Sequence, residues 1–100
     1  MNGRTEVRGR IISALKYNSK KTGNEGVRLD YFFETESAFK ETDNFVGYEP
    51  HDYFTDDISL FEKARQNIMC PVSIVFVQEP QKSNPMKIRA VIKDIVPLRK

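Results

Sequence analysis

The sequence has few of the residues on which disulfide-linked domains, zinc sites and membrane anchors depend. Its 100 residues include one cysteine, Cys70, one histidine, His51, and no tryptophan. A single thiol excludes an internal disulfide framework and a cysteine-based zinc cluster. No apolar run approaches the roughly 20 residues that span a bilayer, and the charged first residues do not resemble a secretory signal. We therefore expect a cytoplasmic protein that does not enter the membrane.

Catalytic constellations are also missing. His51 stands beside Asp52, but no third group completes a triad, and neither a glycine-rich phosphate loop nor an HExxH motif is present. Asp56 and Asp57 fit a helix-capping role better than a metal pair. Cys70, among apolar residues, is expected to be an inert buried thiol. The sequence thus predicts a non-catalytic protein without a metal, a cofactor or a small-molecule substrate.

The charges are present but segregated along the chain. Residues 1–28 carry seven basic and two acidic side chains, and residues 58–100 carry eight basic and three acidic ones. Residues 29–57 carry nine acidic side chains and a single basic one, Lys40. If the two basic segments meet in space, the molecule has one electropositive face. The alternative is that these charges are solvated on separate sides.

Alternation of apolar and polar residues predicts strands over residues 7–17, 27–36, 46–54, 72–78 and 86–98. In the first, Val7, Ile11 and Leu15 are expected to share one face, and Gly9 stands where a bent strand needs no side chain. Pro50 places the third strand at a sheet edge or a bulge. Residues 37–45 are expected to form an irregular connection.

One stretch favours a helix. Residues 59–62 match a capping box, and apolar residues at helical spacing extend the expected helix to residue 68, with Pro71 ending it. The expected core-facing positions are Leu60, Phe61, Ala64 and Ile68. Three strands, a helix and two strands form the layout of an OB-fold, a five-stranded Greek-key barrel with one short helix between strands 3 and 4. We expect one such all-β domain over residues 1–100.

Three segments resemble the small OB-fold single-stranded DNA-binding proteins of phages and mobile elements. They are VRGRI (7–11), KYNSKKTGNEGVRLDYFF (16–33) and NPMKIRAVIKDIVPL (84–98). The resemblance implies a protein that protects or organises single-stranded DNA in replication, recombination or transfer, in the host cell cytoplasm. Since several such proteins, including the filamentous-phage gene-five protein, are dimers, it also implies a homodimer.

Binding a single strand requires cations along the phosphates and flat rings on which bases stack. The predicted cations are Arg8, Arg10, Lys16, Lys20, Lys21 and Arg28 in the first basic segment, and Lys82, Lys87, Arg89 and Lys93 in the second. The predicted rings are Tyr17, Phe32, Tyr48 and Tyr53. For Tyr17 and Phe32, partial core burial remains an equal alternative.

Two other functions fit the same pattern. An OB-like barrel is also used as a protein-interaction scaffold, with a partner docked on acidic residues 29–57 or on a strand edge. An RNA-binding barrel has the same sequence features as a DNA-binding one.

Overall fold

The computed structural model describes residues 3–18, 20, 23–81 and 86–98. Its elements, in chain order, are β1 (Arg4–Asn18), β2 (Glu25–Phe33), the 3-10 turn η1 (Glu36–Ala38), β3 (Phe39–Glu41), β4 (Val46–Tyr48), β5 (His51–Thr55), α1 (Ser59–Arg65), β6 (Val72–Pro80) and β7 (Ile88–Pro97). Five strands form an antiparallel sheet in the order β5-β2-β1-β6-β7, and β3 pairs only with β4.

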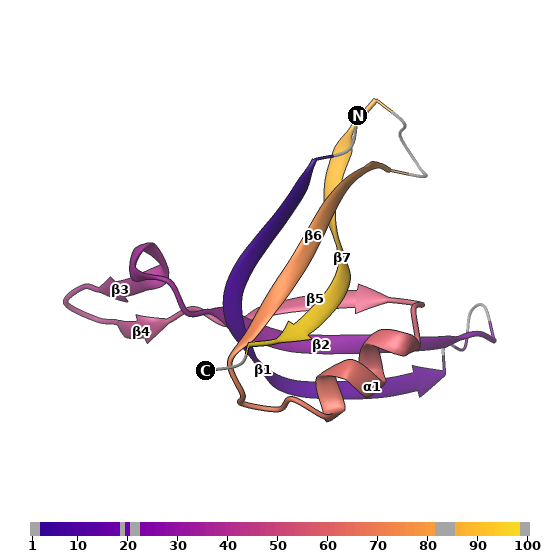
Figure 1. The fold of residues 1–100 in the computed structure, drawn as a ribbon, viewed down its shortest axis with the longest axis horizontal. Coiled ribbons are helices and arrows are strands. Elements are labelled where there is room, and N and C mark those ends of the chain that lie inside the picture. Colours follow the sequence, from indigo (N-terminus) through magenta and orange to yellow (C-terminus); the bar gives the residue numbers. More distant parts are fainter. Residues whose placement is uncertain (1–2, 19, 21–22, 82–85, 99–100) are drawn as a thin grey trace.

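Strand β1 belongs to both halves of this sheet. Residues 4–9 pair with β6, and residues 9–18 pair with β2. Figure 1 shows β1 curving from an upright layer with β6 and β7 into a lower layer with β2 and β5. The change of partner occurs at Gly9, which pairs with both Phe33 and Val72. The predicted bend at Gly9 is therefore confirmed.

The bend requires a residue without a side chain. A Cβ atom at Gly9 would lie 2.5 Å from the carbonyl oxygen of Phe32 and 3.1 Å from Cδ1 of Ile74. The first of these atoms belongs to the backbone of β2 and cannot rotate away. Gly9 thus allows β2 to approach β1 closely where the sheet folds over.

An irregularity in β1 changes which residues face inward. The register with β2 shifts between Ile11 and Ser13, so the strand gains one residue relative to its partner. Beyond this bulge Ala14 pairs with buried Leu29, whereas Leu15 is 56% exposed. The expectation that Leu15 shares the inward face of Ile11 is therefore wrong, because one extra residue inverts a period-2 pattern.

The core lies between the two halves of the folded sheet. In β2, Val27, Leu29 and Tyr31 alternate with more exposed residues and are buried. The fully buried side chains from the other elements include Ile11, Leu60, Ile74 and Ile92. Helix α1 packs against β1, β7 and β2, with Leu60 and Ala64 buried beneath it.

The helix is shorter than expected and is capped differently. It ends at Arg65, and Ile68 is exposed in the following loop. The amide and hydroxyl of Ser59 both donate to Oδ1 of Asp57, at 3.1 and 2.6 Å. The Ser59 hydroxyl is therefore not the cap of a capping box. Asp57, one of the two acidic residues expected to cap the helix, accepts a hydrogen bond from the amide of the helix's first residue instead, whereas the N-cap residue Ile58 makes no side-chain cap hydrogen bond.

The expected third strand is divided in two. Residues 46–48 form β4 in the small second sheet, and β5 begins at His51. Pro50 lies in the break, where the absence of an amide donor interrupts pairing. The expected irregular connection contains η1 and β3, and β2 ends at Phe33 instead of residue 36. The β3–β4 hairpin, residues 39–48, projects from the body in Figure 1 and is called the arm.

The described residues thus form a mostly-β, antiparallel fold with one short α-helix, as predicted. No ladder between described residues joins β5 to β7, and these two strands are the edges of the five-stranded sheet. Cys70 is exposed in the loop before β6, so the prediction of a buried thiol is wrong. No helix in the described part of the chain has the length and apolar character needed to cross a membrane.

The contact at Gly9 makes a stability prediction. Gly9→Ala is expected to destabilise the fold by about 1–3 kcal/mol, since the new methyl group overlaps a backbone oxygen. Chemical denaturation of both proteins measures the difference. Gly3→Ala is the control, because a Cβ there lies 3.5 Å from its nearest neighbour, Gln78 Oε1. Equal stability of the Gly9 variant and the parent contradicts the proposed constraint.

Helix docking makes a pH prediction. Lys63 Nζ donates to Asp94 Oδ1 at 2.6 Å, and this hydrogen bond lowers the pKa of Asp94 below its ordinary 3.8. Because the folded-state pKa is depressed, the stabilisation is present above about pH 4 and is lost as the pH falls through the folded-state value. Asp94→Asn is expected to remove this dependence at a cost below about 1 kcal/mol, since the pair is partly exposed.

Denaturant titrations between pH 2.5 and 7 measure this effect, with Asp43→Asn on the arm as the control. If Asp94→Asn keeps the parent's full acid dependence, the Lys63–Asp94 contact does not contribute.

Candidate nucleic-acid interface

A groove of about 560 Å³ separates the two edge strands of the sheet. Residues from both basic segments and from β5 line it. Those that bear on binding are Tyr17, Gly26, Tyr53, Phe54, Arg89 and Lys93. Of the predicted site residues, the fold therefore brings two rings and two cations together at this groove. The rings are Tyr17 of β1 and Tyr53 of β5, and the cations are Arg89 and Lys93 of β7.

Tyr17 lies at one end of this groove, and the absence of a side chain at Gly26 allows its ring to lie there. It pairs with Gly26 across the β1–β2 ladder, and a Cβ atom at Gly26 would lie 2.6 Å from Tyr17 Cζ. The ring therefore lies across the glycine, and it remains 37% exposed. It meets the Phe54 ring edge-on, with 6.5 Å between centroids. Tyr17 is therefore not part of the hydrophobic core, and base stacking on it stays a prediction.

The outer surface of β1, β2 and β5 continues from Tyr17 as a row of aligned side chains. Leu15 pairs with Arg28, and Arg28 pairs with Phe54, so the three stand side by side. Phe54 is 55% exposed, and the Arg28 guanidinium lies 5.7 Å from its ring centroid. We call Leu15, Tyr17, Arg28 and Phe54 the platform. It offers rings and a cation to solvent, as base stacking requires.

Acidic groups limit the positive charge of this surface. Arg28 lies 3.3 Å from Asp30 and 4.0 Å from Asp52, measured between nitrogen and carboxylate oxygen. Asp56 and Asp57 also line the groove. Phosphate is therefore attracted only where the cations outweigh these carboxylates. The described residues contain no group of histidine, cysteine and carboxylate side chains that could hold a metal ion.

Two cations of β7 lie near one glutamate, and one of them, Lys93, forms an ion pair with it. Arg89 pairs with Glu79 across the β6–β7 ladder, and Lys93 Nζ lies 2.6 Å from Glu79 Oε2. This hydrogen bond raises the pKa of Lys93, so that the ammonium remains charged. Lys93 is the extra residue of a β7 bulge, because Val75 pairs with Asp94 and the next pair involves Ile92. The bulge interrupts the alternation of side-chain directions along β7 at Lys93.

Arg8 and Arg10 lie at the bend and do not line the groove. Both flank Glu34, with Nε–Oε distances of 3.4 and 2.6 Å. Arg10 also donates from Nη1 to the carbonyl oxygen of Met69 at 2.7 Å. The two guanidinium groups therefore hold the chain after β2, and the loop before β6, against the bend. Glu34 partly balances their charge, and the Arg8 side chain remains exposed.

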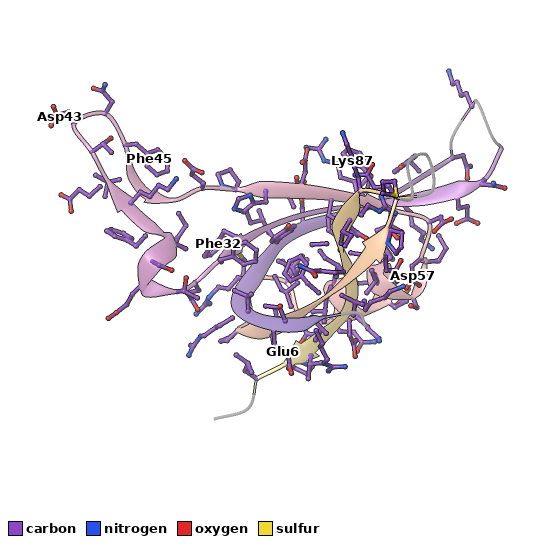
Figure 2. The ribbon with its side chains drawn as sticks, turned by 90° about the horizontal axis from the view of Figure 1, so that it is seen from above. Glu6, Phe32, Asp43, Phe45, Asp57 and Lys87 are labelled. Carbon is purple, nitrogen blue, oxygen red and sulfur yellow. The ribbon has the colours of Figure 1, made fainter. Side chains whose placement is uncertain are left out.

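Two other predicted rings lie near the arm. Phe32 stacks on Tyr48 with centroids 5.2 Å apart, and Tyr48 meets Phe39 at 5.5 Å. Figure 2 shows Phe32 between the body and the arm. These contacts attach the arm to the sheet and place both rings away from the groove. Tyr53, by contrast, pairs with Leu29 and packs against the core while lining the groove.

The remaining predicted cations lie at the periphery. Lys16 faces inward with its ammonium 4.9 Å from the Phe61 ring centroid, where it covers helix α1. Lys20 and Lys87 are exposed next to the two hairpin turns. Lys21 and Lys82 lie outside the described residues. Of the predicted cations in the described part of the chain, those without an ion pair to another described residue are Lys16, Lys20, Lys87 and Arg89.

Sequence reasoning missed Leu15 and Phe54. Leu15 was assigned to the core because nothing in the sequence marks the bulge after Ile11. The outward position of Phe54 could be predicted from the sequence. It alternates with Tyr53 in a strand whose other outward residue is Asp52. An outward aromatic residue on an edge strand is a feature of binding surfaces.

Comparison with known proteins supplies no relative for this surface. No protein-family model matches the chain, and no curated protein or solved structure matches it at a significant level.

Proposed function

We propose that this protein binds single-stranded DNA, without catalysing a reaction, across the platform and the adjoining groove. The observation that carries the proposal is the exposed set of Tyr17, Phe54 and Arg28, in which a cation and two rings are fixed by the β1–β2–β5 ladders. Every base has a face that stacks on such rings, so the surface is suited to an unpaired strand of any sequence. Duplex bases are already stacked and cannot use it.

The topology supports the same proposal. The order β5-β2-β1-β6-β7, with α1 between β5 and β6, is that of an OB barrel in which the third and fifth strands stand apart. In OB-folds the outer face of strands 2 and 3 and the flanking loops bind oligonucleotides. Here those strands are β2 and β5, which carry Arg28 and Phe54. We accordingly propose an OB-type fold with the arm inserted between its second and third strands.

The charge distribution indicates how the binding energy is divided. Arg8, Arg10 and Arg28 have carboxylate neighbours in the protein, so few cations remain for phosphates. With about two to four phosphate contacts, the log–log dependence of affinity on salt has a slope of about −1.5 to −3. Stacking therefore contributes much of the affinity. In the cell, the role we propose is protection or organisation of single-stranded DNA during replication, recombination or transfer.

Fluorescence anisotropy with labelled oligo-dT, oligo-U and a duplex of equal length, at two salt concentrations, tests the proposal. The expected result is tighter binding of oligo-dT than of duplex at both concentrations, with the shallow slope given above. Equal binding of duplex and single strand contradicts a stacking surface. A preference for oligo-U over oligo-dT reassigns the function to RNA binding, and binding to none of the three rejects nucleic acid as the ligand.

The platform makes a separate prediction. Phe54→Ala is expected to weaken oligo-dT binding by about 1–3 kcal/mol at an unchanged salt slope, because loss of stacking releases few counterions. Phe45→Ala is the matched control, since it removes an exposed ring from the arm. Anisotropy titrations at several salt concentrations give both quantities. Equal losses for the two variants would show that the strand does not distinguish the platform from other exposed rings.

A further inference from the structure

The arm exposes more apolar surface than its own contacts cover. Phe39, Phe45, Val46 and Tyr48 are all at least 36% exposed, and Val46 reaches 65%. An isolated two-stranded hairpin is only marginally stable in water, and this one is joined to the body mainly by the stacking of Tyr48 on Phe32. Exposed apolar clusters of this kind mark interaction sites.

The charge of the arm restricts its partner. Its pairing places Glu41 beside Val46 and on the same face as Phe39 and Tyr48. Asp43 lies at the arm's tip in Figure 2. Lys40 is the arm's basic residue, and its ammonium is engaged by Glu49 at 3.0 Å. A partner surface must therefore be both apolar and basic.

The protein itself carries such a surface at the start of β7. Ile88 is 65% exposed, and Lys87 and Arg89 on either side of it have no ion pair within the described residues. As an edge of the sheet, β7 also has backbone groups available for pairing with an added strand. Residues 87–90, which we call the β7 edge, are thus apolar like the arm and opposite to it in charge.

We propose that the arm of one molecule docks on the β7 edge of a second copy. Figures 1 and 2 show the arm and the β7 edge well separated in one molecule, so the contact has to form between molecules. Arm-to-arm pairing is disfavoured because Glu41 and Asp43 of one arm would face the same acidic residues of the other arm. Docking on the other sheet edge, β5, would bring the acidic arm against Asp52 and Asp56. Charge therefore selects the β7 edge.

Association of this kind is heterologous, because two different surfaces meet. An open assembly of this kind has one arm and one β7 edge unoccupied at its two ends. The contact therefore leads to a row of molecules or, where the two ends meet, to a closed ring. Only short segments take part, and a small interface implies weak association. The Arg89 side of β7 borders the groove, so that neighbouring molecules would present their platforms along one continuous assembly. This last consequence rests on the proposed function, whereas self-association does not.

Sedimentation velocity over a range of protein concentrations, without DNA, tests the contact. Two charge-reversed variants are needed: Glu41→Lys/Asp43→Lys on the arm, and Lys87→Glu/Arg89→Glu on the β7 edge. Each alone is expected to lower the association constant by about tenfold or more, because like charges then oppose each other. An equimolar mixture of the two variants is expected to restore association, since each arm then finds an oppositely charged edge.

The control is Glu6→Lys/Glu62→Lys, which raises the net charge by as much as the arm variant does, at one exposed strand position and one exposed helix position away from both surfaces. Circular dichroism confirms folding of all variants. If the parent remains monomeric at the highest concentration, the proposal is wrong. If the β7-edge variant associates like the parent while the arm variant does not, the arm docks on another surface and the proposed contact with the β7 edge is wrong. Binding of a short oligo-dT by the arm variant, measured in parallel, separates failure of this contact from failure of the proposed function.

Discussion

The folding of the sheet over itself at Gly9 is the constraint on which the rest of the structure depends. One strand serves two layers only because its residue at the bend allows the Phe32 carbonyl to approach within van der Waals distance. The apolar faces of both layers then meet, and Ile11, Leu29 and Ile74 become fully buried between them. Glu34, held between Arg8 and Arg10, fixes the chain that leaves β2 at the same point. Backbone geometry and an ion cluster therefore act together at the bend.

The same fold separates the surfaces of the molecule by charge and by chemistry. Among the described residues, Arg8 and Arg10 at the bend lie beside Glu34, which reduces the positive charge that this region presents. What remains exposed on the outer layer is a set of fixed rings with Arg28 beside them. A surface of this type favours a ligand with accessible flat faces over one that offers charge alone. The modest net charge of +2 is consistent with this balance.

The arm and the β7 edge give this small sheet protein two further exposed surfaces. Edge strands with unpaired backbone groups are generally protected, because they otherwise pair with other chains. Here the edge at β7 stands next to exposed basic and apolar side chains, and the arm carries acidic and apolar ones. The arm therefore adds a second kind of surface outside the core, and among the described ring contacts the stacking of Phe32 on Tyr48 joins it to the body.

Local pattern in the sequence determined the mostly-β class, the inward face of β2, the bend at Gly9 and the position of the helix, because alternation, glycine and capping residues act over a few neighbours. The side chains that face outward from β1 were decided by the tertiary structure. A single bulge after Ile11 turned Leu15 to solvent, and no local signal marks it. The pairing of Arg8 and Arg10 with Glu34 likewise joins residues more than twenty positions apart. Charge counted along the chain therefore overstated the cations available to a ligand, because opposite charges distant in sequence become neighbours only when the sheet folds.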